Sequence, residues 1–507
     1  MSRTRKTSIN SIVGLGGSIA NSLLSFVLQA VFIRLLGLEY SGINSLFTSI
    51  LNILNIAELG VSNAVLFRLY SSIAKGEKKA TEVLLAEYKR ICYLIGGIIL
   101  LGGLVCVPFL DNLVNGGVPD FPESLTIPFG IVLMTSVCNQ FLDYKKILLI
   151  AHQDRFIVTI TTYSCTFICH ALQIFTLFFF KNIYVYLLCK LFTTCANGLI
   201  CGWISKKKYQ IQWNEKDTLS QQERIDIVKD SGTLAVYKIC RTVDASIDTF
   251  LISKFVDIST TAIYGSMSMI LSSITDLLGQ FNDGMIASVG DLYASGDKER
   301  VESVFYQSFH FTFILHGICV AVLVPLMGPF VDWWIGYTLP DVVVYMMLAN
   351  FYMHGLAANA STFRNSMGLF RKGWKQPAAT VLLNAFFSIL FVKKIGLLGT
   401  LLGTFFARIL TQTWYEPYII CKHGYDKKPY KYYLRYIAYS VMVVGVSMAN
   451  AAIASLLPTP DNLVSLVWHG VIYLVVSAGG LVLLGFFFKE QKAVINRVIQ
   501  MVKGRRM

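Results

Sequence analysis

The sequence predicts an all-α polytopic membrane protein with about 14 transmembrane helices, in two repeated six-helix lobes around a central cavity plus an extra C-terminal helix pair. Three observations lead to this fold class. Of the 507 residues, 54% are hydrophobic and 15% are charged, and the mean hydropathy is +0.57. The apolar residues gather in runs that reach the roughly 20 residues a helix needs to cross a bilayer. The pattern of runs then repeats. This composition excludes a soluble enzyme and a disordered chain.

The expected spans follow one another with short polar connections. They lie near residues 9–36, 42–67, 86–110, 125–150, 156–180, 183–204, 227–255, 261–288, 304–330, 341–368, 376–393, 396–420, 434–457 and 463–488. The basic start of the chain and the apolar run after it have the look of a signal peptide. That run is too long and lacks a small-residue cleavage site, so we count it as the first span.

Basic residues fall in alternate connections and at both ends of the chain. Lys206–Lys208 and the lysines around Lys427 belong to this set, whereas the connections at 111–124, 331–340 and 458–462 contain neither Lys nor Arg. Basic segments stay in the cytoplasm, so we expect both termini there. The net charge of +14 has the same cause and does not indicate nucleic-acid binding.

An internal repeat divides the chain. The segment Leu69–Lys75 is similar to Leu292–Lys298, about 220 residues later. Six spans separate the copies, so the repeat is parallel, an arrangement that places a transport site between the halves. We therefore expect an N-lobe at 1–205 with spans one to six, a cytoplasmic linker at 206–225, a C-lobe at 226–422 with spans seven to twelve, the last two spans at 433–489 and a basic cytoplasmic tail at 490–507.

A charged stretch interrupts the apolar run at 227–255. Lys238, Arg241, Asp244 and Asp248 follow one another at spacings of three and four residues, so their side chains share one helical face. A charge at the bilayer centre costs about 2.5–3.5 kcal/mol on insertion scales, and such residues mark transport paths. The alternative is an ion-pair ladder, in which Arg241 pairs with the two aspartates and only fixes helix packing.

Polar stripes continue this pattern on other expected spans. They comprise Asn44, Thr48, Asn52, Asn55 and Glu58 in the second span, Asp276, Gln280 and Asp283 in the eighth, and Asn350 and His354 in the tenth, with Arg364 beside them. One such stripe can simply join helices by hydrogen bonds. With the charged face of the seventh span and a further stripe in the first span, which includes Ser18, Ser22 and Gln29, five spans carry polar faces. Together they favour a shared water-filled cavity. Arg34 and Arg68 lie near span ends, where arginines either reach for the interface or contact a ligand, and Arg408 has no evident partner.

The sequence contains no catalytic constellation. There is no Walker A sequence, no Gly-x-Ser-x-Gly and no His-Glu-x-x-His. No connection is long enough for a nucleotide-binding domain, and the cysteines sit in apolar runs without metal-ligand spacing. We therefore expect no enzymatic activity, no metal and no cofactor. A secondary transporter or a flippase remains.

Several stretches resemble the polysaccharide-transport flippases of the multidrug/oligosaccharidyl-lipid/polysaccharide exporter superfamily. They are Leu36–Ile43, Asn52–Ala64, Arg68–Tyr70, Asp248–Phe255, Ala287–Leu292, Trp334–Gly336, Asn350–Tyr352, Arg364–Gly368 and Trp414–Pro417. The resemblance is collinear and runs from about residue 10 to 425. One departure is Asp291, where the family pattern has Asn, and the last two spans contribute nothing distinctive.

The resemblance implies movement of an undecaprenyl-pyrophosphate-linked oligosaccharide from the inner to the outer leaflet of the bacterial plasma membrane by alternating access. It further implies a proton or sodium counter-ion and an envelope polysaccharide polymerase as partner. The pyrophosphate would contact Arg241 and Lys238, with Arg364, Arg68 and Arg34 as further candidates, since a guanidinium matches phosphate oxygens. The polar stripes, with Glu58, Asp276 and His354 among them, would line the sugar cavity.

Two other interpretations stay open. Asp244 and Asp248 stand one turn apart and, with Asn384 of the eleventh span, form a candidate ion-coupling site, unless the acids only hold Arg241 in place. A drug or small-molecule cation antiporter of the same superfamily is the alternative function, favoured by Glu58, Asp276 and Asp283. A structural scaffold would gain nothing from buried charge.

Overall fold

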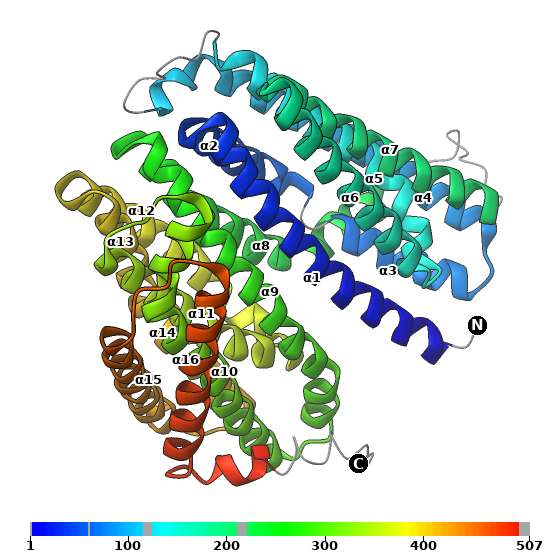
Figure 1. Cartoon of the computed structure of the whole chain (residues 1–507). Coiled ribbons are helices and arrows are strands. Elements are labelled where there is room, and N and C mark those ends of the chain that lie inside the picture. The colour runs from blue at the N-terminus through cyan, green and yellow to red at the C-terminus, as the bar shows by residue number, and fades with distance from the viewer. Residues whose placement is uncertain (1–2, 59–60, 115–123, 210–220, 496–507) are drawn as a thin grey trace. The chain divides into compact units, whose positions relative to one another are not determined.

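The structure is a computed structural model that describes residues 3–58, 61–114, 124–209 and 221–495 (Figure 1). Within these ranges the chain forms helices joined by short turns and contains no strand. The helices are α1 (Arg3–Leu36), α2 (Leu38–Leu54), α3 (Val61–Ala74), α4 (Lys78–Cys106), α5 (Thr126–Ala151), α6 (Arg155–Phe180), α7 (Ile183–Tyr209), α8 (Gln221–Phe255), α9 (Ile258–Ala294), α10 (Lys298–Ile335), α11 (Asp341–Ser366), α12 (Lys375–Ile395), α13 (Leu397–Leu410), α14 (Gln412–Gly424), α15 (Tyr430–Leu456) and α16 (Leu463–Gly485). The all-α fold class is confirmed.

Each expected span coincides with one of these helices or with a pair of shorter ones. By length and composition, eight helices in the described part of the chain could cross a membrane. The others are shorter, or carry too much charge or polarity for that criterion. The total of about 14 crossings therefore stays a prediction.

Two expected spans are divided rather than continuous. The run at 42–67 forms α2, a short 3-10 helix at Asn55–Glu58 and α3. The run at 396–420 breaks at Thr411, whose φ and ψ of −126° and −74° lie outside the helical region. The Thr411 hydroxyl donates to the Ala407 carbonyl at 2.6 Å, and the Thr413 hydroxyl donates to the Arg408 carbonyl at 3.1 Å. Hydroxyls that take up backbone carbonyls in this way compete with the helical ladder, and a hydropathy window does not detect them.

Packing divides the chain into two units, Met1–Gly265 and Ser266–Met507, and the division falls inside α9. In the first unit, α5 packs against α4 and α7, while α6 packs against α1 and α7. In the second unit, α11 packs against α10, α13 and α14, and α12 packs against α13. The pairings α4–α5, α5–α7 and α6–α7 have counterparts in α10–α11, α11–α13 and α12–α13 of the second unit. The parallel repeat itself stays a prediction. The lobe boundaries at 1–205 and 226–422 remain a prediction.

Helix α8 belongs to the first unit by its contacts. It packs against α2 and α3, and the Ser253 hydroxyl donates to the Leu113 carbonyl at 2.8 Å. Directly after it, Ile258 lies against Gly42 of α2, where a Cβ on the glycine would stand 2.1 Å from the Ile258 carbonyl oxygen. Only a residue without a side chain permits this approach. The charged helix is therefore fixed against the polar helix α2.

The C-terminal helices α15 and α16 are integral to the second unit. Both pack against α10, whose Phe305, Phe309 and Phe313 are fully buried. Tyr439 of α15 stacks on Phe313 with ring centroids 4.1 Å apart, and its hydroxyl lies 2.8 Å from His310 Nδ1. Although the sequence makes this helix pair look like an addition, it covers the aromatic core of the unit.

Candidate functional site

The charged face of α8 is graded in exposure. Arg241 is exposed, Lys238 and Asp244 are half-buried, and Asp248 is 7% exposed. The hydroxyl of Tyr264, in α9, donates to Asp248 Oδ2 at 3.4 Å. The basic end of the face is thus accessible, and the acidic end is held within the protein. This arrangement leaves Arg241 able to meet a ligand anion, while Asp248 is positioned by its neighbours.

The polar stripe of α2 lies on that helix's accessible side. Thr48 and Asn52 are exposed and Asn44 is half-buried, whereas the opposite side buries Ile43, Leu46, Phe47 and Ile50 in the core of the first unit. Asn55, at the end of the stripe, accepts a hydrogen bond from the Ser136 hydroxyl at 2.8 Å. The side chain of Glu58 lies outside the described residues. The stripe therefore supplies uncharged polar groups from the helix on which α8 packs.

Two further candidate cations come from the same unit. Arg34 lies in the last turn of α1 and is exposed, and Arg68 on α3 is half-buried. Helix α3 contacts α8, and α1 contacts α2. The candidate cations and the stripe of α2 thus lie on four helices that are linked by packing in the order α1, α2, α8 and α3.

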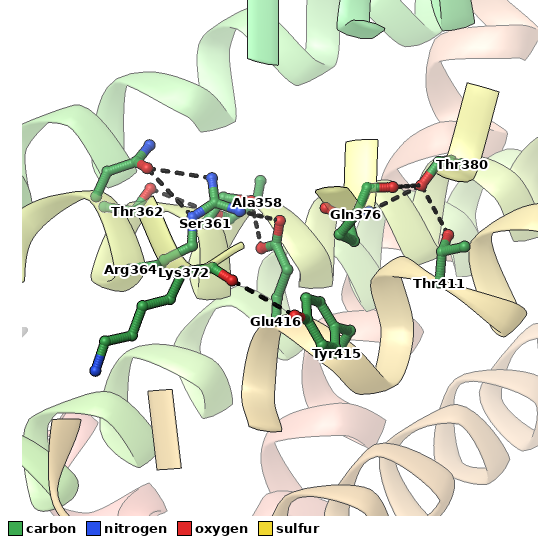
Figure 2. Close-up of polar contacts among 11 residues, drawn as sticks. Ala358, Ser361, Thr362, Arg364, Lys372, Gln376, Thr380, Thr411, Tyr415 and Glu416 are labelled. Atoms are coloured by element: carbon green, nitrogen blue, oxygen red, sulfur yellow. Dashed lines mark hydrogen bonds and ion pairs between the residues drawn. The ribbon is translucent and has the colours of Figure 1, made fainter. Parts of the chain in front are cut away.

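Arg364, in the second unit, occupies a very different environment (Figure 2). It is 3% exposed, and its Nη1 donates to Glu416 Oε1 of α14 at 2.6 Å. The Ser361 hydroxyl donates to the other oxygen of that carboxylate at 2.6 Å. On the far side of the guanidinium, Nε and Nη2 donate to Asn365 Oδ1 at 3.3 and 3.1 Å. Because the guanidinium is buried among these partners, a phosphate could contact it only after a local rearrangement.

Glu416 is a buried polar residue that the sequence interpretation missed, at 2% exposure. The sequence does indicate this residue, because Glu416 is the only acidic residue in the apolar run at 396–420. The rule that singled out α8 applies equally to it. Its partner Arg364 lies on a different helix, and this pairing could not be read from spacing along the chain.

Other candidates of the second unit serve contacts between helices. The Asn350 side-chain amide donates to the Leu401 carbonyl at 3.0 Å, and Arg408 Nη1 donates to the Asn350 carbonyl at 3.1 Å. Asn384 is fully buried and accepts from the hydroxyls of Ser388 at 2.8 Å and Thr404 at 3.1 Å. These bonds join α11 and α12 to α13. Asn350, in the polar stripe of the tenth span, thus joins helices by hydrogen bonds, which is the alternative to lining a cavity.

The remaining candidates lie on α9 and α11. Asp276 is exposed, and Gln280 and His354 are half-buried. The side chain of Asp283 lies outside the described residues. These groups belong to the second unit, as does Asn384, whereas Asp244 and Asp248 belong to the first. The central cavity and the three-residue coupling site stay predictions.

A family model described as polysaccharide biosynthesis protein matches residues 9–283, slightly more than half of the chain. The match takes in α8 with its charged face and the polar stripe of α2. No curated protein matches the chain at a significant level.

Solved structures share the fold at low sequence identity. The chain is similar to the lipid II flippase MurJ in an inward closed conformation, with 12% identity, a TM-score of 0.67, and coverage of 94% of this chain and 98% of that one. It is also similar to an inward-facing multidrug resistance MATE transporter of the MOP superfamily, with 15% identity, a TM-score of 0.64, and coverage of 80% and 98%. The MATE transporter VcmN of Vibrio cholerae follows, with 14% identity, a TM-score of 0.55, and coverage of 85% and 100%.

Proposed function

Because this chain belongs to the polysaccharide biosynthesis protein family and has the fold of the multidrug/oligosaccharidyl-lipid/polysaccharide exporter superfamily, we propose that it is a flippase for a lipid-linked oligosaccharide. The substrate would be an undecaprenyl-pyrophosphate-linked repeat unit, moved from the inner to the outer leaflet by alternating access. The bacterial plasma membrane, with both termini in the cytoplasm, is the matching location. A reporter fused after Met507 should then score as cytoplasmic.

The observation that carries this proposal is the accessible basic end of α8, within the family match. The pyrophosphate of such a lipid brings about two negative charges. A bilayer offers these charges no counter-ions, so a carrier needs cations at depth. Arg241 is exposed on α8, with Lys238 one turn before it. A planar guanidinium binds phosphate oxygens in bidentate fashion, which makes Arg241 the first candidate contact.

The polar stripe of α2 offers hydrogen-bonding groups for the sugar part of the proposed substrate. A sugar chain needs many hydrogen-bonding partners without strong charge, and Asn44, Thr48 and Asn52 provide amides and a hydroxyl on the accessible side of α2. The polyprenyl tail needs no protein cavity, since it can remain in the bilayer. The proposal thus assigns pyrophosphate to α8 and sugar to α2, on two helices that pack together.

The alternative is a cation antiporter of the same superfamily. It is favoured by the exposed Asp276 on α9 and by the fold, since the MATE and MurJ structures resemble the chain about equally, with TM-scores of 0.64 and 0.67. The fold therefore does not separate the two functions.

One experiment distinguishes them. The purified protein is reconstituted into liposomes that contain a fluorescent polyprenyl-pyrophosphate oligosaccharide, and a lectin added outside measures the sugar exposed on the outer leaflet. We expect the exposed fraction to rise faster than in protein-free liposomes. A parallel assay follows the uptake of a fluorescent organic cation against a proton or sodium gradient. Cation uptake without exposure of the sugar would replace the flippase proposal by the antiporter.

A further inference from the structure

A cluster of basic and aromatic side chains lies in the second unit, where the turn before α12 meets the end of α14. The 3-10 helix at Leu369–Lys372 contacts α14, and the Tyr415 hydroxyl donates to the Lys372 carbonyl at 3.4 Å (Figure 2). Two connections that are about 50 residues apart in the chain are thus neighbours in the structure. We define the basic–aromatic cluster by its six members, which are Lys372, Trp374, Lys375, Tyr418, Lys422 and His423.

Two lysines of the cluster come from different elements and act on the same histidine. Burial, and after it the nearby ammonium groups of Lys372 and Lys422, lower the pKa of His423, which lies beyond the expected span at 396–420. The Lys422 ammonium also donates to the Tyr418 hydroxyl at 2.8 Å. Both lysines are exposed. Like charges that converge in this way repel each other, so an anion placed between them would be stabilised.

The lysines of the cluster form no ion pair with an acid in the part of the chain that the structure describes. The ion pairs of that part include none of Lys372, Lys375 and Lys422. Glu416 is the single acid of α14, and it is buried against Arg364. Figure 2 shows the Lys372 side chain directed away from that pair. The positive charge of the cluster is therefore available to a ligand.

The position of the cluster along α12 matches the edge of a bilayer. The stretch Lys375–Ile395 has 21 residues and could cross a membrane by its length and composition, since roughly 20 helical residues cross the hydrocarbon core. Lys375 begins this stretch, and its ammonium stands 5.8 Å from the ring centre of Trp374. Trp374 is 46% exposed, and tryptophans of this kind are typical of the level of lipid headgroups.

An exposed apolar surface continues from the cluster along α12. Leu382, Phe386, Ile389 and Leu390 are all exposed, and their spacing of three and four residues places them on one face of the helix. A surface of this composition suits acyl chains and not water. Cations at one end and an apolar stripe beyond them complement a molecule with an anionic head and a hydrocarbon tail.

From this juxtaposition we propose that the basic–aromatic cluster binds the phosphate headgroup of an anionic phospholipid, with the acyl chains along the exposed face of α12. Basic sites between membrane helices at the cytoplasmic side bind anionic headgroups by this chemistry, and ammonium groups recognise phosphate as point charges. The charge pattern of the sequence predicts that side for both connections. The site lies in the second unit, whereas the substrate contacts proposed on α8 and α2 belong to the first. It does not depend on the flippase assignment.

Native mass spectrometry of the delipidated protein in neutral detergent tests this site. The probes are phosphatidylglycerol, phosphatidylcholine and sodium pyrophosphate. We expect phosphatidylglycerol to bind and phosphatidylcholine not to bind above background. Lys372→Gln with Lys422→Gln should weaken phosphatidylglycerol binding by roughly five-fold per lysine. The matched control, Lys75→Gln with Lys78→Gln, removes two exposed lysines of the first unit and should change binding less than about two-fold.

The charge-preserving pair Lys372→Arg and Lys422→Arg guards against a folding artefact, because it should retain phosphatidylglycerol binding. Should the double glutamine variant not fold, Lys372→Gln alone carries the test. Equal binding by the parent and the glutamine variants would overturn the proposal, and so would equal binding of the two phospholipids. Displacement of phosphatidylglycerol by equimolar pyrophosphate would also overturn it, since the cluster would then take a free phosphate compound instead of a bilayer lipid.

Discussion

At the scale of single residues, the two arginines proposed near the substrate phosphate differ in what their side chains already contact. Arg241 is exposed on α8, so a phosphate could reach it without displacing a buried partner. Arg364 is buried and bonded to Glu416 and Asn365. Its guanidinium would have to give up an acid before it could bind an anion. We therefore rank Arg241 first for the pyrophosphate, and we expect Arg364 to act mainly within the second unit.

Replacing Arg241 tests this ranking. We expect Arg241→Ala to lower the rate of sugar exposure in the lectin assay at least ten-fold, because each charge-assisted contact contributes about 1.5–3 kcal/mol. Arg241→Lys should recover part of the rate, since a point charge replaces the guanidinium fork. Lys254→Ala, at an exposed position in the last turn of the same helix, is the control and should transport normally. Normal transport by Arg241→Ala would show that the charged face is structural.

The effects of replacing Arg364 and Glu416 on the stability of the protein should depend on each other. Removing one partner of a buried ion pair leaves an uncompensated charge and costs about 3–5 kcal/mol, whereas replacing both by apolar residues is often neutral. We expect Arg364→Met and Glu416→Leu each to lower the unfolding temperature in detergent strongly, and the double variant to regain most of the loss. Additive losses would mean that the two side chains do not depend on each other. A stable double variant that no longer transports would show a second role for Arg364.

At the scale of elements, the close approach of α2 to the start of α9, directly after α8, depends on one glycine. A methyl group at Gly42 would meet the Ile258 carbonyl at 2.1 Å, so Gly42→Ala forces α2 away from the start of α9. We expect a loss of about 1–3 kcal/mol in the free energy of unfolding, as for other overpacked sites. Gly97→Ala is the control, because nothing lies within 4 Å of its added Cβ. Thermal unfolding of both variants in the same detergent measures the difference, and equal curves would contradict the close packing.

The attachment of α15 to α10 depends on the buried side chain of Asn450. Its side-chain amide donates to the Ala321 carbonyl of α10 at 2.8 Å and to the Ser477 hydroxyl of α16 at 2.7 Å. Asn450→Ala leaves these buried acceptors without their donor, at about 1–3 kcal/mol for each unsatisfied group. We expect a clear fall in unfolding temperature, and almost none for Ser455→Ala, an exposed position on the same helix. A fall no larger than that of the control would indicate a loosely attached helix pair.

The sequence predicted elements better than it predicted their partners. Fourteen apolar runs predicted the positions of the helices, because hydropathy is local, but they did not show that two of the runs are divided, one of them at Thr411. The face shared by Lys238, Arg241, Asp244 and Asp248 followed from helical spacing alone. Helical spacing could not predict the Arg364–Glu416 pair or the packing of α8 on α2, because each of these contacts joins helices that are far apart in the chain. Asn384 accepts hydrogen bonds from Ser388 and Thr404, and its place at an ion site stays a prediction.

At the scale of the whole molecule, an ion-driven flippase would need groups that link substrate movement to the uptake of an ion. The acids Asp244 and Asp248 are the proposed coupling groups, and both belong to the first unit. A substrate pyrophosphate that draws Arg241 toward itself would leave them without part of their counter-charge. The acids could then take up a proton or a sodium ion.

The last prediction follows from this competition for Arg241. In vesicles with an imposed proton or sodium gradient, the parent should expose sugar faster than without a gradient. Asp248→Asn should abolish that acceleration, because its buried carboxylate becomes a neutral amide, and Asp244→Asn should reduce it. Tyr264→Phe removes the hydroxyl that donates to Asp248 but keeps the charge, so it should shift the ion concentration required without abolishing the response. Asn384→Ala tests whether Asn384 contributes to the ion site. If it does, this variant should also lose the acceleration by the gradient, and if the site is confined to the first unit, the acceleration should remain. If both asparagine variants still respond to the gradient as the parent does, the acids only hold Arg241 in place, and the ion must bind elsewhere.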